Sequence, residues 1–153
     1  MPKSKTDRRV RKRVCGGKKS QKRRYATNKE KSHIVRMFFE MLNVVKLYHW
    51  KTHSFSQHSA TDQLYGRLNE HIDKFVEVLL GKEQSRIQMV EREIRLMDPS
   101  NTKDFQSRIF EYRAFLTDMN IYFDTSRDSD LLNIRDEILG DINQFLYLLT
   151  FDK

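Results

Sequence analysis

The chain has only one cysteine, Cys15, among its 153 residues. A single cysteine cannot form an internal disulfide, and chains so poor in cysteine are typical of reducing compartments, so we expect an intracellular protein. No apolar run reaches roughly 18 residues, which predicts that no segment of this sequence is a transmembrane helix. No apolar segment follows the basic N-terminus, so we expect neither a secretory signal nor a membrane partner.

Positive charge is concentrated at one end of the chain. Residues 1–32 contain 14 of the 29 lysines and arginines but only 2 of the 21 acidic residues, which gives them a net charge of +12. The remaining residues then carry a net charge of −4, although the whole chain has +8. The sequence therefore indicates an acidic body with a basic arm and not a uniformly basic fold.

The basic arm, residues 1–32, has almost no apolar periodicity. Such a segment cannot bury enough apolar surface to offset the entropy of ordering it, so we expect a disordered tail followed by a folded domain at 33–153. Its cations would bind the phosphates of DNA, or alternatively RNA, without sequence preference. These cations are Lys3, Lys5, Arg8, Arg9, Arg11, Lys12, Arg13, Lys18, Lys19, Lys22, Arg23 and Arg24. A solubility or nuclear-import element is the alternative function of the same residues.

Four segments have the apolar spacing of amphipathic helices, at about 28–52, 60–81, 102–123 and 129–149. Thr27 and Glu30 have the spacing of a capping box for the first helix, and Gly81 is a candidate stop for the second. In the longer segment 82–98 we expect either a short helix or an extended stretch. Since no segment has a strong strand pattern, the expected fold class is all-α, an antiparallel four-helix bundle.

The residues most informative about function are His49, His58, Asp62, Asp73 and Glu77. All have side chains that bind divalent metals through nitrogen or oxygen. At about 100° per residue, the last four lie at relative angles of about 0°, 40°, 60° and 100° around a helix. They therefore form one narrow stripe, set apart from the main apolar face of the same helix.

These residues carry a resemblance to a known family. Residues 46–81 (KLYHWKTHSFSQHSATDQLYGRLNEHIDKFVEVLLG) and residues 130–151 resemble the Dps-type mini-ferritins (DNA-binding proteins from starved cells), which have a ferritin-like fold. The resemblance implies a hollow homododecamer that oxidises iron(II), preferentially with peroxide, stores the ferric product and binds DNA. One subunit would supply His49, His58 and Asp62 to each iron site. Its two-fold partner would supply Asp73 and Glu77. Trp50 would be an electron donor that intercepts oxidising equivalents.

Two departures from the family pattern leave alternatives open. The loop Lys51–Gln57 is shorter than is usual, which puts the position of His58 in question. The E-x-x-H pairs of long-chain ferritins are also missing, so we expect no di-iron centre within one subunit. One alternative is a ferritin-fold protein that packages nucleic acid without oxidising iron, and another is a peroxide-detoxifying or other-metal enzyme. The nucleoid, the nucleus, a viral factory and a virion all remain open as locations.

The remaining histidines and an acidic group near the last helix are interpreted structurally. His33, His53 and His71 are not expected to bind metal, and His71 lies on another side of the helix from His58. Asp124, Asp128 and Asp130 lie near the expected start of the fourth helix, where acidic residues are favoured. Lining of an iron entry pore is their alternative role.

Overall fold

Across residues 25–151, the part of the chain that this computed structural model describes, the fold consists of four α-helices. They are α1 (Asn28–Lys51), α2 (Phe55–Glu83), α3 (Thr102–Asp118) and α4 (Ser129–Leu148), with single 3₁₀ turns at Met119–Ile121 and Leu149–Phe151. No strand occurs within these residues, so the all-α class and the number and order of the helices are confirmed.

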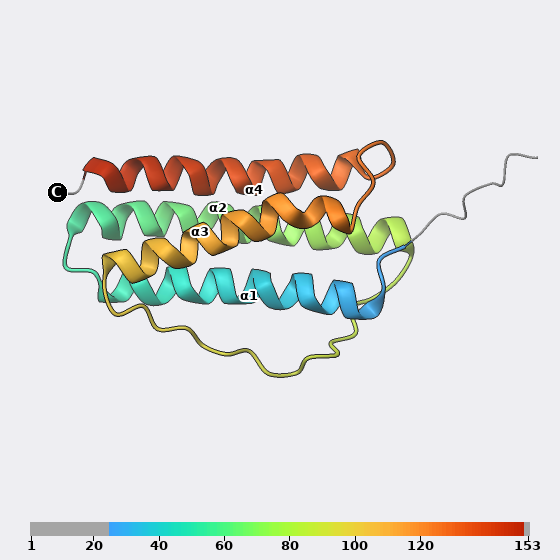
Figure 1. Cartoon of the computed structure of the whole chain (residues 1–153), viewed down its shortest axis with the longest axis horizontal. Coiled ribbons are helices and arrows are strands. Elements are labelled where there is room, and N and C mark those ends of the chain that lie inside the picture. Colours follow the sequence, from blue (N-terminus) through green and yellow to red (C-terminus); the bar gives the residue numbers. More distant parts are fainter. Residues whose placement is uncertain (1–24, 152–153) are drawn as a thin grey trace, which may run out of the picture.

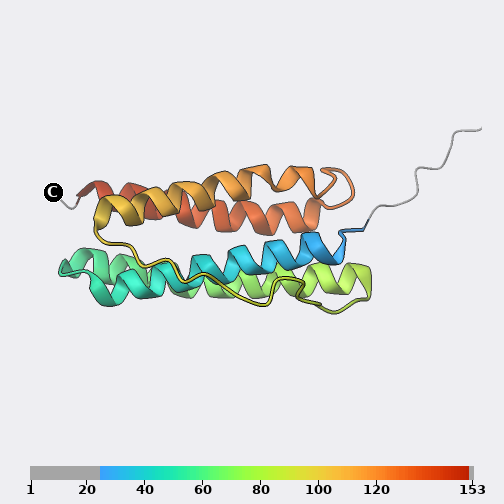
Figure 2. The same cartoon turned by 60° about the horizontal axis from the view of Figure 1, so that its bottom comes forward.

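The connector, residues 84–101, runs along the whole length of the bundle beside α1 (Figure 1). α2 therefore ends where α1 begins, and α3 starts at the opposite end and runs in the same direction as α2 (Figure 2). α1 is antiparallel to α2, and α3 is antiparallel to α4. The connector contains no helix, which decides between the two alternatives predicted for it in favour of an extended chain.

Local capping interactions set the helix starts. Thr27 caps α1 in a complete capping box, because Glu30 N–H donates to its Oγ1 and Glu30 Oε2 accepts from its N–H at 2.7 Å. Ser54 caps α2 by accepting from the N–H of Gln57, and this cap places the start of the helix earlier than the predicted residue 60.

The predicted end of α2 at Gly81 is wrong. The helix continues to Glu83, and Gln84 takes the left-handed conformation (φ 50°) that a C-terminal glycine usually supplies. Gly81 does not have a positive φ, so the helix end does not use the ability of glycine to adopt the left-handed conformation. The side-chain amide of Gln84 donates to the carbonyl oxygen of Gly81 and so holds the cap in place.

The core lies between the four helices and follows the predicted periodicity. Its largest fully buried side chains come from α1 to α4 and include Phe38, Phe75, Phe105, Met41, Leu116 and Ile138. The rings of Phe38 and Phe75 meet edge to face at 5.4 Å and join α1 to α2. None of the helices described is long and apolar enough to span a bilayer.

A buried ion pair fixes the start of α1. Lys31 Nζ lies 2.7 Å from Glu83 Oε2, with only 5% and 8% of the two side chains exposed, and Glu83 also accepts from the N–H of Ala26. Residues 28–32 therefore form the start of α1, as the helix predicted at about 28–52 requires, and the tail boundary predicted at residue 32 falls inside this helix. The cations from Lys3 to Arg24 lie outside the described residues.

Candidate metal centre

The turn between α1 and α2 is only three residues long, Thr52–Ser54. The N–H of Thr52 donates to Tyr48, and its hydroxyl both donates to Gln57 Oε1 and accepts from the N–H of Ser54. The short spacing between His49 and His58 is thus accommodated by starting α2 at Phe55. His58 consequently lies in the first turn of α2, directly against the last turn of α1.

His49 and His58 form a reciprocal pair. Nδ1 of His49 lies 3.0 Å from the carbonyl oxygen of His58, and Nδ1 of His58 lies 3.0 Å from the carbonyl oxygen of His49. The two rings stack, with centroids 3.8 Å apart and planes inclined by 23°. Because a carbonyl oxygen only accepts, each Nδ1 carries the proton, which leaves the Nε2 of a neutral ring with a lone pair for a metal.

Asp62 lies beside this pair, one turn further along α2. Its Oδ1 is 3.9 Å from His49 Nε2 and 4.0 Å from Lys46 Nζ, and 66% of its side chain is exposed. His49 itself is almost fully buried. Of the three ligands predicted to come from one chain, His49 lies against His58 and near Asp62.

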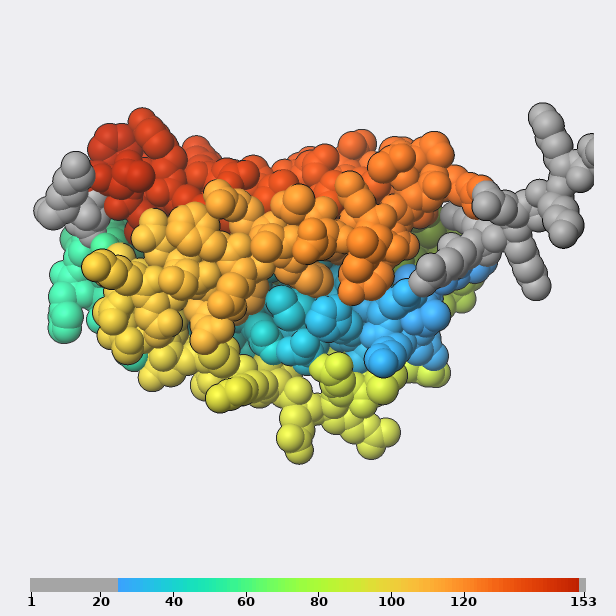
Figure 3. Space-filling view, in the orientation of Figure 1, coloured from blue at the N-terminus to red at the C-terminus, as the bar shows by residue number. Residues whose placement is uncertain are grey.

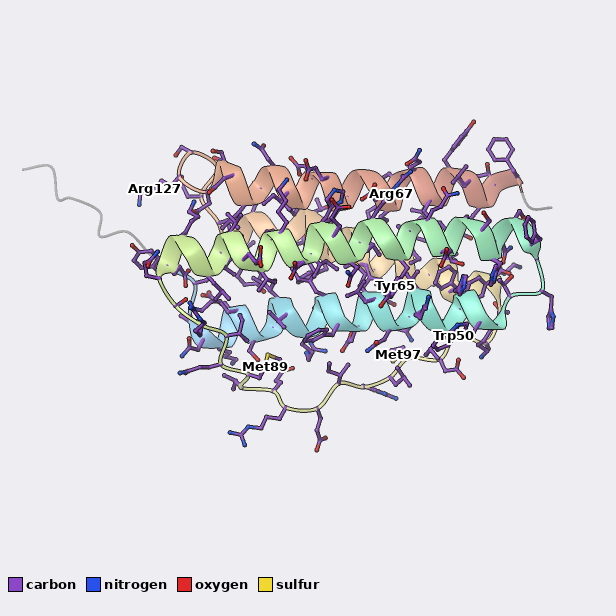
Figure 4. All side chains as sticks on the ribbon, turned by 180° about the vertical axis from the view of Figure 1, so that it is seen from behind. Trp50, Tyr65, Arg67, Met89, Met97 and Arg127 are labelled. Atoms are coloured by element: carbon purple, nitrogen blue, oxygen red, sulfur yellow. The ribbon has the colours of Figure 1, made fainter. Side chains whose placement is uncertain are left out.

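Trp50, the predicted electron donor, lies on the outside of the same region and is 69% exposed. Lys46 Nζ lies between two aromatic rings, 5.7 Å from the centroid of Trp50 and 4.7 Å from that of Tyr65. Figure 4 shows Trp50 and Tyr65 on the face of the molecule where α2, α1 and the connector lie next to one another. Tyr65 was not singled out from the sequence; its position one turn from Asp62 was the available signal.

Asp73 and Glu77 do not join this group within one chain. Both are exposed on α2, and Asp73 is 11 residues beyond Asp62, which corresponds to about 16 Å along a helix. Among residues 25–151 there is no cluster of three or more histidine, cysteine or acidic side chains arranged to hold a metal ion. A site containing all five predicted ligands requires a second chain.

A hydrogen-bond network between α1, α2 and α3 lies next to the histidine pair and holds its backbone in place. Tyr48 donates to Gln57 Oε1 at 2.6 Å and lies 2.8 Å from the hydroxyl of Thr102. The Tyr48 ring stacks on Phe105 at 3.9 Å. Tyr48 and Gln57 directly precede His49 and His58, so this bond holds the backbone on both sides of the pair. Tyr48 fits the apolar spacing of residues 28–52, but this spacing does not reveal the role of its hydroxyl.

The acidic residues around the start of α4 are occupied in local hydrogen bonds and ion pairs. Asp124 accepts from the hydroxyl and N–H of Ser126 and from the N–H of Arg127, and these hydrogen bonds lower its pKa. Burial opposes the charged forms of Lys82 and Asp130, but their 2.7 Å hydrogen bond, further hydrogen bonds and the attraction between the opposite charges together outweigh it. The pKa of Lys82 is raised and that of Asp130 lowered. Asp128 lies 3.0 Å from the same lysine. This agrees with the structural interpretation of the three aspartates.

The other histidines have partners within the fold or lie apart from the pair. His71 Nδ1 is 2.8 Å from Asp141 on α4, which joins α2 to α4. His33 lies 3.2 Å from Arg36 and edge-on to Phe115. His53 is exposed in the turn. His71 and His33 are thus engaged with residues other than His49 and His58.

Comparison with known proteins gave a single family. Residues 49–149 match a family of unknown function (DUF5856), a range that starts at His49 and ends after α4. No curated protein and no solved structure matched the chain. Because the match covers about two thirds of the 153 residues, the chain belongs to this family of unknown function, DUF5856.

Proposed function

We propose that this protein is a Dps-type, ferritin-like iron(II) oxidase and iron store that also binds nucleic acid through its basic N-terminal tail. The observation that carries the proposal is the His49–His58 pair with Asp62 beside it. The course of the connector adds support, because one long crossover between the second and third helices is the arrangement of ferritin-like bundles.

The proposed iron site is completed by a second copy of the chain. On α2 the ligand types fall into two groups, one at His58 and Asp62 and the other at Asp73 and Glu77. A two-fold axis halfway between these groups, near Leu68, would bring the partner's Asp73 and Glu77 over the histidine pair. The same operation would complete a second site, so each dimer would contain two.

The surface around this axis suits close contact with a partner. Beside Asp73 lies a hollow of about 310 Å³, lined mainly by apolar side chains from α1, α2 and the connector, among them Phe39, Leu42, Ile72, Ile87 and Met89. Gly66 lies in the exposed stripe next to the axis, and a Cβ atom there would meet nothing within 4 Å in the single chain. Its missing side chain would let two α2 helices approach each other closely.

Iron(II) would be the substrate at this site. The two imidazoles would bind ferrous iron, and the carboxylates would stabilise the ferric product as it forms. Peroxide would accept two electrons, one from each of two iron(II) ions, and two protons would convert it to two water molecules. Trp50 would supply an electron where only one iron ion is bound, which would prevent release of a radical.

Oxidation kinetics test this proposal. Iron(II) is added anaerobically to the purified protein, peroxide follows, and ferric absorbance is recorded for the parent chain and for Asp73→Ala/Glu77→Ala. The control is Glu111→Ala/Asp118→Ala, which removes the same two charges from exposed positions of α3. We expect fast oxidation in the parent and the control, and loss of it in the first variant. Equal, slow oxidation in all three would leave the nucleic-acid-packaging function and end the oxidase proposal.

A further inference from the structure

The connector is an extended chain with an unpaired backbone. Within the described chain, residues 86–98 make no main-chain to main-chain hydrogen bond. Only two of their N–H groups find a protein acceptor, since those of Val90 and Glu91 both donate to Ser32 Oγ. Figure 3 shows the side chains of this segment projecting beyond α1 at the edge of the molecule. An open strand edge of this kind is a template for pairing with another chain.

Apolar side chains of the connector point away from the body. Val90, Ile94 and Leu96 are 58%, 38% and 59% exposed, and they occupy alternating positions, as residues on one side of a strand do. Met89 and Met97 lie on the opposite side of the extended segment and are partly buried. The outward row, which also includes Arg92, is therefore mainly apolar and exposed in the single chain.

We propose that a second copy of this chain covers the connector, pairing with it as an antiparallel two-stranded ribbon across a two-fold axis at Glu93 or Ile94. In a symmetric antiparallel pair, one residue lies opposite its own copy and the others pair outward from it. With Glu93 at the centre, Glu91 faces the partner's Arg95 and Val90 faces the partner's Leu96. With Ile94 at the centre, Ile94 faces the partner's Ile94.

Charge complementarity favours these two registers, and the one centred on Ile94 more strongly, because the other also places Glu93 opposite its own copy. In both, Arg95 faces a glutamate of the other chain, either the partner's Glu91 or the partner's Glu93, and symmetry makes each contact twice. A register centred on Arg92 would instead place Glu91 opposite the partner's Glu93 twice, which is unfavourable for like charges. Arg95 makes no ion pair with any residue between 25 and 151, so it is available for a partner.

The proposed ribbon lies level with the middle of the bundle. Glu91 pairs with Arg36 and Asp98 with Lys51, so residues 93–94 lie level with about residues 40–42 of α1. The contacts His49–His58 and Lys31–Glu83 set the register of α2 on α1. They place Leu68, near the midpoint between the two ligand groups on α2, level with about residue 42 of α1 as well. One two-fold axis can therefore serve both the ribbon and the proposed iron site, although the ribbon does not depend on iron chemistry.

Disulfide trapping tests the ribbon. Glu93→Cys and Ile94→Cys are made separately in a Cys15→Ser chain, and dimer formation under mild oxidant is followed on denaturing gels at low micromolar concentration. The control is Gln88→Cys, an exposed position of the same connector whose two copies would lie more than about 30 Å apart. We expect one of the two variants to form covalent dimer at least about tenfold faster than the control.

Charge reversal adds a specific readout. Arg95→Glu in the trapping chain should slow dimer formation. Mixing it with a trapping chain of reversed partner charge should restore dimer formation in mixed dimers, with Glu91→Arg in the Glu93→Cys chain and Glu93→Arg in the Ile94→Cys chain. Trapping no faster than the Gln88→Cys control, or slowing by Arg95→Glu without rescue, would overturn the ribbon. If trapping is no faster than in the control but the protein still oxidises iron, the ribbon is disproved and the proposed function is unaffected.

Discussion

The Nδ1 atoms of His49 and His58 each lie 3.0 Å from the carbonyl oxygen of the other residue. The last turn of α1 and the first turn of α2 therefore orient each other's imidazoles. In metal-binding histidines the N–H of the second ring nitrogen commonly donates a hydrogen bond to a carbonyl or carboxylate, which fixes the ring and its tautomer. Here each proposed ligand provides that support for the other.

We predict that loss of either histidine weakens metal binding more than loss of one ligand alone would suggest. His58→Ala removes a ligand and also the ring that stacks on His49, so affinity for cobalt(II) or anaerobic iron(II) should fall at least about 10–100-fold. Calorimetry or the visible spectrum of bound cobalt measures this. His53→Ala, in the neighbouring turn, is the matched control. Equal affinity of both variants would remove the pair from the site.

A bulky residue at Gly66 should separate folding from assembly. Gly66→Gln should raise helix propensity by up to about 1 kcal/mol, since the open space around the residue leaves the single chain unstrained. The larger side chain should nevertheless block the proposed α2–α2 contact and abolish oxidation. Light scattering and thermal unfolding measure the two effects. Gly140→Gln, at an equally open position on α4, should assemble normally, and assembly of Gly66→Gln as in the parent would contradict the proposed axis.

The buried pair of Lys31 and Glu83 should be a strong determinant of stability. Glu83→Ala leaves the lysine buried without its counter-charge, so we expect a loss of about 3–5 kcal/mol in the free energy of unfolding. Denaturation by urea measures this loss. Lys31→Met/Glu83→Leu removes both charges and should be more stable than Glu83→Ala alone. A double variant as unstable as the single one would indicate that the hydrogen bond from Ala26 to Glu83 dominates.

Removal of residues 1–24 should abolish most nucleic acid binding while keeping the fold. The cut must fall before Thr27 and Lys31, because the capping box and the buried ion pair belong to α1. Since each neutralised phosphate contributes about 0.9 to the salt dependence of binding to duplex DNA, affinity should fall by at least about 10³ at low salt.

The control for this truncation is a full-length chain in which the lysines and arginines of residues 1–24 are replaced by glutamine. It keeps the tail length and should bind as weakly as the truncated chain. Titration of duplex DNA and of RNA at several salt concentrations gives the slopes. Unchanged affinity for both nucleic acids after truncation would disprove the role of the tail.

Local sequence signals predicted most of the fold. The apolar periodicity identified all four helices, and the Thr27 capping box located the start of α1. The sequence did not reveal that α2 ends at Gln84 and not at Gly81. A non-glycine residue adopts the left-handed conformation only where local hydrogen bonds stabilise it, and here the bond from the Gln84 side chain to Gly81 does so. The choice between a helical and an extended connector was also open, since periodicity alone does not separate the two for short apolar segments.

The candidate site was predicted in part. Helical spacing was sufficient to place His58, Asp62, Asp73 and Glu77 on one stripe of α2, whereas their division between two subunits was implied only by the family resemblance. The stacking of His49 on His58 was not predictable, because it depends on how tightly Thr52–Ser54 turns. The hydroxyl of Tyr48 was missed for the same reason, since its partners Gln57 and Thr102 come from other helices.

Subunit mixing tests most directly the central claim, an iron site shared between two chains. His49→Ala and Asp73→Ala/Glu77→Ala are each inactive in this account, but a mixed dimer contains one complete site. We predict that unfolding and refolding the two variants together restores peroxide-dependent iron(II) oxidation to about a quarter of the parent rate, since random pairing gives about half mixed dimers. Activity no higher than the sum of the separate variants, in a sample shown to contain mixed dimers, would contradict the shared site.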